Sequence, residues 1–194
     1  MSRSALPTSF YARPTPEVAR RLLGHLLVSE VGGRRTSGRI VETEAYVGPD
    51  DPACHGYGAR RTRRNASLFA SPGTAYVYFT YGMHWCLNAV TEQPGFPAAV
   101  LIRALEPLEG LATMRRRRRA ATDRDLCSGP AKLCQALGVT GREDGIPLIR
   151  GRLRVLRDRS RQHYTITVTP RIGITRATDW PLRFVIKDSP WASR

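Results

Sequence analysis

The sequence contains few lysines, no closely spaced pair of cysteines and no long apolar run. None of its stretches approaches the roughly 18–20 apolar residues that a membrane-spanning helix needs, and no signal peptide is recognisable. The cysteines lack CxxC spacing, which argues against a zinc ribbon and against a secreted disulfide framework. They are Cys54, Cys86, Cys127 and Cys134. We therefore expect buried, reduced thiols in a protein of the bacterial cytoplasm, with no membrane partner.

Positive charge is what the chain has in excess. Lysine and arginine number 31 against 16 aspartates and glutamates, which gives a formal net charge of +15. A basic surface gains free energy when a polyanion releases its condensed counterions, so the charge predicts a phosphate-rich partner. Charge alone leaves open a ribosome-associated or simply basic protein.

The length of 194 residues fits one domain, drawn at 1–194. Residues 1–14 are polar and contain proline, so we expect a loosely held arm there, and within the domain residues 1–5 are drawn as a loose arm. Apolar spacing predicts a helix from Thr15, two strands joined around residues 32–33, strands on both sides of Gly82, and an apolar strand over 98–107. The predicted class is α+β: a single mixed domain with a curved, mainly antiparallel sheet flanked by helices and a protruding hairpin.

Two segments have compositions that suit contact with phosphate. Residues 47–74 are rich in glycine, proline and arginine and show little periodicity, and so long a loop is usually functional. Arginines occupy positions 115–119 at the end of an expected helix. This run is interpreted as a solvated helix end, and contact with DNA remains the open alternative.

Chemistry-bearing residues concentrate between positions 44 and 103. The stretch "RIVETEAYVGPDDPACHG", residues 39–56, places two glutamates on an otherwise apolar strand, shortly before an aromatic residue and a histidine. Aromatic rings stack on bases and arginines follow phosphates, so this mixture suits an unstacked base held beside a nucleic-acid backbone. The set comprises Glu44, Tyr46, His55, Tyr78, Tyr81, Asn88 and Arg103.

Four motifs in this order and spacing resemble the alkyladenine (3-methyladenine) DNA glycosylases of the mammalian type. They are "RIVETEAYVGPDDPACHG", "PGTAYVYFTYGMHWCLNAV", "VLIRALEPLEGL" and "DLCSGPAKLCQALG", and "RIGITRA" and "PLRFVIKDSPW" extend the resemblance almost from Leu6 to Trp191. The resemblance implies a monofunctional enzyme of base-excision repair. Such an enzyme flips a damaged purine out of double-stranded DNA and hydrolyses its N-glycosidic bond without a cofactor.

The resemblance also implies a role for each residue of the set. Glu44 corresponds to the general base that activates water, expected at a strand end facing a wet pocket, and Arg103 to the arginine that orients Glu44 or the water. Glu42 is assigned to the opposite face of the strand and interpreted as structural. The base pocket is formed by Tyr46, His55, Tyr78 and Asn88, the last of which discourages normal guanine through its exocyclic amine.

Other matched positions concern the grip on DNA. Tyr81 corresponds to the residue that enters the minor groove and fills the gap left by the flipped nucleotide. Backbone-contacting positions correspond to Arg60, Thr62, Met83, His84 and Lys132. The chain departs from the better-known members at Arg63, where they have proline, and at His84, where they have tyrosine, which affects DNA grip or pH dependence.

The same residues limit the chemistry. No lysine or N-terminal proline lies among the matched pocket residues, and a lyase needs an amine to form a Schiff base. The cysteines and histidines lack metal-ligand spacing, so no metal is expected. A monomer suits a protein that scans a duplex. Two alternatives are kept: a noncatalytic nucleic-acid-binding module that has retained the DNA groove, and a hydrolase of modified RNA or free nucleosides.

Overall fold

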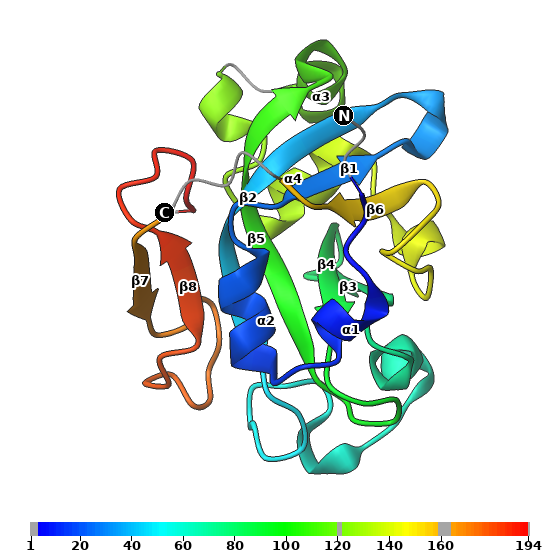
Figure 1. Cartoon of the computed structure of the whole chain (residues 1–194), viewed down its shortest axis with the longest axis vertical. Coiled ribbons are helices and arrows are strands. Elements are labelled where there is room, and N and C mark those ends of the chain that lie inside the picture. The colour runs from blue at the N-terminus through cyan, green and yellow to red at the C-terminus, as the bar shows by residue number, and fades with distance from the viewer. Residues whose placement is uncertain (1–3, 120–121, 159–163, 194) are drawn as a thin grey trace.

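An eight-stranded antiparallel sheet forms the centre of the computed structural model, which describes residues 4–119, 122–158 and 164–193. The strand order is β3-β4-β5-β2-β1-β6, and β8 joins the sheet by pairing with both β2 and β7. The strands are β1 (Leu26–Ser29), β2 (Thr36–Tyr46), β3 (Ala75–Thr80), β4 (His84–Val90), β5 (Ala99–Glu109), β6 (Leu153–Leu156), β7 (Ile166–Thr169) and β8 (Arg183–Ile186). The sheet is curved and flanked by helices, which confirms the predicted α+β class (Figure 1).

Strand β2 lies in the interior of the sheet, because both of its edges are paired with other strands. Along one edge it pairs with β5, and its other edge is divided between β1 near its start and β8 from Glu42 to Glu44. The pairing with β5 shifts register around Glu42, and such bulges increase the local twist. Glu44 lies opposite Leu101 on β5 and Arg183 on β8. The two glutamates of the motif therefore lie inside the sheet.

The helices cover the sheet. They are α1 (Thr8–Tyr11), α2 (Thr15–Leu22), α3 (Leu111–Arg118) and α4 (Pro130–Leu137). In Figure 1, α2 lies in front of β2 and β5, and α4 lies behind the sheet and packs on β4 and β5. Helix α2 faces the core with Val18, Ala19 and Leu22, spaced for one helical face.

The expectation of a loose arm over 1–14 is wrong from Leu6 onward. Leu6, Phe10 and Tyr11 are buried in the main core, because α1 and the residues just before it pack their apolar side chains inward. Residues 1–3 lie outside the described residues. No helix in the described part of the chain is long and apolar enough to cross a membrane. All four cysteines are free and buried, as predicted.

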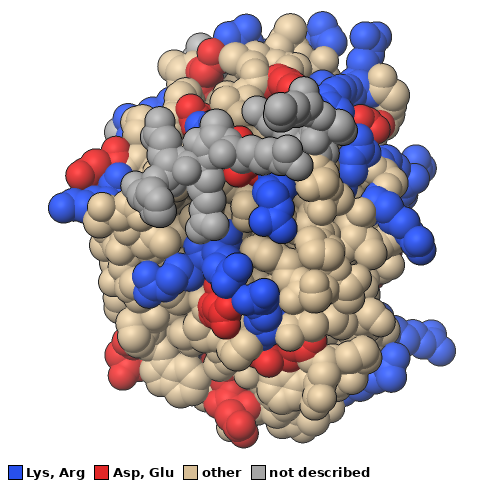
Figure 2. Space-filling view, in the orientation of Figure 1, with Lys and Arg blue, Asp and Glu red and all other residues tan. Residues whose placement is uncertain are grey.

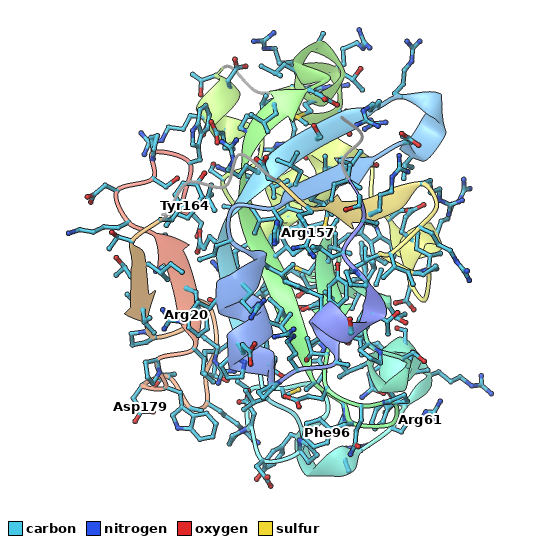
Figure 3. The ribbon with its side chains drawn as sticks, in the orientation of Figure 1. Arg20, Arg61, Phe96, Arg157, Tyr164 and Asp179 are labelled. Atoms are coloured by element: carbon cyan, nitrogen blue, oxygen red, sulfur yellow. The ribbon has the colours of Figure 1, made fainter. Side chains whose placement is uncertain are left out.

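The long loop after β2 contains two short 3-10 helices, Tyr57–Ala59 and Arg63–Phe69. Figure 3 shows Arg61 on this loop and Phe96 on the neighbouring β4–β5 loop, at the lower end of the molecule. A side chain at Gly48 would place its Cβ 2.7 Å from the Phe96 ring, and φ is +93° there, so the loop requires glycine at the point where the two loops meet. This packing positions the loop against the sheet.

Candidate active site

A cavity of about 560 Å³ opens between β3, β4, β5 and two loops. Alternate residues of β3 face it, namely Tyr76, Tyr78 and Thr80, as the period of two predicts. The long loop contributes Cys54 and His55, and the segment that follows β7 contributes residues 172–176. Six of the seven residues of the predicted set line the cavity: Tyr46, His55, Tyr78, Tyr81, Asn88 and Arg103.

Glu44 lies one layer behind the cavity wall and is fully buried. Its Oε1 accepts a hydrogen bond from the Ile172 backbone N–H at 2.8 Å and pairs with the Arg103 guanidinium at 3.1 Å. Its Oε2 accepts a bond from the Tyr46 hydroxyl at 3.0 Å. All three partners line the cavity. The expectation that Glu44 faces a wet pocket directly is therefore corrected, because its partners lie between its carboxylate and the open space.

Burial and charge keep this cluster in defined protonation states. Burial raises the pKa of the Tyr46 hydroxyl, and the neighbouring Glu44 carboxylate raises it further, so this hydroxyl remains a donor. Burial opposes the charge of Arg103, but the carboxylates of Glu44 and Glu42 outweigh it and raise its pKa. The cluster thus places a permanent cation and a neutral phenol within hydrogen-bond reach of one carboxylate.

Glu42 belongs to the same cluster, which corrects its assignment to the opposite face. Residues two apart on a strand share a face, and Arg103 donates from Nε to Glu42 Oε1 at 2.8 Å. Glu42 is fully buried and does not line the cavity. One arginine therefore bridges both glutamates of the motif.

Aromatic rings form the side walls. The His55 and Tyr78 rings lie 4.5 Å apart at 71°, and His55 Nδ1 lies 2.7 Å from the Tyr76 hydroxyl. Desolvation lowers the pKa of His55, and the charge of Arg64 lowers it further, so the imidazole is neutral at pH 7. The cavity is therefore bounded by π-faces and a neutral histidine.

A buried ion pair supports the Tyr46 wall. Arg171 donates two hydrogen bonds to Asp51, of 2.5 and 2.8 Å, and both side chains are fully buried. The Arg171 guanidinium lies 4.8 Å from the centre of the Tyr46 ring. Asp51 also accepts from the backbone N–H groups of Val47 and Ala53, so the pair fastens the start of the long loop beneath the ring.

Asn88 and Tyr81 both line the cavity, but one is buried and the other is exposed. Asn88 is buried, and its Nδ2 donates to the Tyr76 carbonyl at 3.0 Å, which fixes the orientation of its amide. Tyr81 lies at the β3–β4 turn with φ of +50° and 79% of its surface exposed. The protruding hairpin of the sequence prediction is present, with Tyr81 and Met83 exposed at its tip.

The five residues predicted to contact the DNA backbone lie outside the cavity lining. Met83 and His84 are exposed on the hairpin, and Arg60 and Thr62 are exposed on the long loop. Lys132 lies in the first turn of α4, two residues from Pro130, which lines the cavity, and donates to Ser128 Oγ at 3.1 Å.

Sequence reasoning missed several contributors. Ile172 acts through its backbone N–H, for which no side-chain pattern exists. Asp51 and Arg171 lie in two of the quoted motifs, but they are 120 residues apart and no local pattern pairs them. Tyr76 could have been found, because it shares the strand parity of Tyr78.

Known proteins are similar to this chain over most of its length. The family model described as "Methylpurine-DNA glycosylase (MPG)" matches residues 9–190. A protein of Francisella tularensis subsp. tularensis strain FSC 198 is 47% identical over 183 residues, covering 93% of this chain and 94% of its own. A protein of Bacillus cereus strain AH187 is 45% identical over 201 residues, covering 97% and 98%. Both relatives carry the provisional name 3-methyladenine DNA glycosylase.

Proposed function

The chain belongs to the methylpurine-DNA glycosylase family, and on that premise we propose that it excises damaged purines from duplex DNA as a monofunctional hydrolase. The proposed substrates are 3-methyladenine, 7-methylguanine, ethenoadenine and hypoxanthine. We assign this activity to one domain over 1–194, acting as a monomer in the bacterial cytoplasm at the nucleoid. The observation that carries the proposal is the pairing of Glu44, directly behind an aromatic-walled cavity, with Arg103, which lines that cavity.

The reaction requires one proton transfer from water. Glu44 accepts a proton from a water molecule whose oxygen attacks C1′ of the extruded nucleotide. The bond between C1′ and the base nitrogen breaks, and its electron pair leaves with the base. A cationic lesion leaves as a neutral base, and Glu44 then gives its proton to solvent. Hypoxanthine leaves as an anion that takes up a proton, so the proton removed from water is balanced by the one gained by the base. The products are a free base and an abasic sugar.

Access of water to Glu44 requires one of its partners to yield. Ile172 donates from the backbone and Arg103 is held by charge, whereas Tyr46 is a neutral side chain that also forms a pocket wall. We infer that contact between an extruded base and the Tyr46 ring displaces the hydroxyl and admits water. Glu44 is thus exposed only when a base occupies the cavity.

The walls account for the preferred class of base. A ring face attracts a cation by about 0.5–2 kcal/mol, so Tyr46, His55 and Tyr78 favour a positively charged alkylpurine over a normal base. The fixed amide of Asn88 discourages guanine through its exocyclic amine. Selectivity then comes from attraction at the walls and rejection by Asn88.

Residues around the mouth bind the duplex in this proposal. Tyr81 fills the gap left by the extruded nucleotide and offsets the few kcal/mol of lost stacking. Phosphates are contacted by Arg60, Thr62, Met83, His84 and Lys132. The lining residues among the described part of the chain include no lysine, which supports hydrolysis without a Schiff base.

Release from defined duplexes tests the function. The protein is incubated with four duplexes that each carry one of the proposed lesions, and abasic sites are then cleaved with alkali. We expect strand breaks at the lesion, free base in solution, and no breaks before alkali. Tight binding without breaks on any lesion would establish the noncatalytic module instead.

A further inference from the structure

Arg103 is shared between two buried carboxylates, and the mechanism above uses one of them. Its Nε donates to Glu42 and its Nη1 pairs with Glu44, at 2.8 and 3.1 Å. Arg103 lines the cavity, whereas Glu42 lies behind it. Glu42 is therefore a charged group placed against the catalytic arginine on the side away from the substrate.

Glu42 is held by the C-terminal tail. Ser193 donates to it twice, from the backbone N–H at 2.6 Å and from Oγ at 2.7 Å. Arg183 on β8 donates from Nε to Glu42 Oε1 at 2.7 Å, and Ser193 Oγ also accepts from Arg103 Nη2 at 3.3 Å. With Nε of Arg103, four donors therefore hold the Glu42 carboxylate, although Glu42 and Ser193 are 151 residues apart in the sequence. Four hydrogen bonds hold the Glu42 side chain in one orientation.

We propose that Glu42, fixed by Arg183 and Ser193, is a positioning residue that divides Arg103 between two carboxylates and so keeps Glu44 able to accept a proton. The inference deepens the proposed function and rests on it. With Glu42 absent, the whole charge of Arg103 falls on Glu44 and holds its carboxylate as an ion-pair partner rather than a base. The tail residue Ser193 becomes part of the catalytic apparatus through Glu42.

The charge environment supports this division. Burial opposes ionisation of Glu42, but the bonds from Ser193 and the charge of Arg103 prevail and lower its pKa, so Glu42 remains a carboxylate at neutral pH. Glu44 is faced by groups from every element packed against it. These are Glu42 and Tyr46 of β2, Cys86 of β4, Arg103 of β5, Arg183 of β8, and Arg171 of the segment after β7.

The pH dependence of excision shows whether Glu42 positions Arg103 against Glu44 or only stabilises the fold. Single-turnover release from a hypoxanthine duplex is measured from pH 4.5 to 9 for the wild type and for Glu42→Gln. Removing the Glu42 charge leaves Arg103 to Glu44 alone and removes repulsion between the carboxylates, and both effects favour ionised Glu44. For Glu42→Gln we expect the acidic limb of the rate–pH profile to move to lower pH by about one unit and the plateau rate to fall roughly tenfold. A lower plateau with an unmoved limb would overturn the proposal.

Variants of Ser193 give a milder test that does not bury an unpaired charge. Ser193→Ala removes two hydrogen bonds and should slow the plateau rate about three- to tenfold, the range for lost hydrogen bonds. Ser193→Thr keeps the hydroxyl and should restore the rate. Ser189→Ala, in the same tail, serves as the matched control and should leave it unchanged. Equal rates for the wild type and Ser193→Ala would contradict a role for the tail.

The two proposals fail in different ways. If wild-type protein releases no base, or if Glu44→Gln releases it at the wild-type rate, the proposed function fails. If the wild type is active and Glu44→Gln inactive, but Glu42→Gln keeps both limb and plateau, only the inference about Glu42 fails. KM is followed throughout, because a positioning role predicts a change in kcat with KM unchanged.

Discussion

Arg171 and Asp51 show how one buried pair can support a pocket wall. The pair is fully buried and bidentate, and it lies beneath the Tyr46 ring at the start of the long loop. Breaking a buried ion pair by removing one partner costs more than the pair itself contributes, because an unpaired charge is left behind. Tyr46 therefore depends for its position on two residues that do not line the cavity.

Arg171→Ala should destabilise the fold by about 3–5 kcal/mol, because it leaves Asp51 buried without a counter-charge. Urea unfolding followed by circular dichroism measures this change. The matched control is Arg13→Ala, whose pair with Glu17 is 39% and 42% exposed, and it should cost about 1 kcal/mol or less. Equal losses for the two variants would show that Arg171 does not support the site.

At the residue scale, local pattern predicts more than long-range pairing does. Strand alternation puts Tyr78 on the same side of β3 as Tyr76, facing the cavity, and the resemblance brought Glu44 and Arg103 together across neighbouring strands. The bond from the Ile172 backbone and the Arg171 pair depend on how the tail returns to β2, which no local pattern encodes. Glu42 was misassigned although its spacing from Glu44 is the strand period itself.

At the scale of elements, the β3–β4 hairpin presents a tip that contributes little to the core. Tyr81 and Met83 are 79% and 69% exposed. Large apolar side chains that are exposed side by side commonly mark a surface that binds a partner. The break in the strand at Gly82 could be predicted from the glycine itself. The structure gives φ of +67° there, a backbone conformation that favours glycine. How far the tip is exposed depends on how the whole sheet packs, which the local sequence does not encode.

Tyr81→Ala should lower release from a duplex by about tenfold or more, because the gap left by the extruded base is no longer filled. Release from a single-stranded lesion should change little, since no stacked gap forms there. Stability should stay within about 0.5 kcal/mol of the wild type. Tyr57→Ala, another exposed tyrosine, is the control. Equal losses on single and double strands would argue against a wedge.

The arginine run of α3 is largely occupied within the protein. Arg115 pairs with Asp123, and Arg117 donates to the carbonyls of Ala136 and Val31. Arg118 donates to the Gln135 side chain at 2.6 Å. The run thus ties α3 to α4 and to the β1–β2 turn, a role that composition alone did not predict because arginines are expected in solvent.

At the scale of the whole molecule, the net charge of +15 sets the strength of DNA binding more than its selectivity. Figure 2 shows Lys and Arg side chains mainly along the upper and right-hand edges of the molecule, with others at its centre and on its left, and acidic side chains among them. Because both signs are present, the excess acts through particular cations rather than through a uniform field.

Salt dependence identifies those cations. The affinity for undamaged duplex should fall linearly with salt on a logarithmic plot, and Lys132→Ala should reduce the slope by about one, the change expected for one lost phosphate contact. Fluorescence anisotropy at several salt concentrations measures the slope. Lys187→Ala, the other lysine, is the control and should leave the slope unchanged. An unchanged slope for Lys132→Ala would remove this residue from the DNA surface.

Single-turnover release by Glu44→Gln, measured beside its affinity for the same hypoxanthine duplex, tests the account most directly. In the proposed mechanism, one carboxylate behind the aromatic wall takes the proton of the attacking water. We expect binding close to that of the wild type, an unchanged thermal midpoint, and release slowed by about a hundredfold or more, the usual effect of losing a general base. Release at the wild-type rate by a folded, DNA-bound Glu44→Gln protein would contradict it.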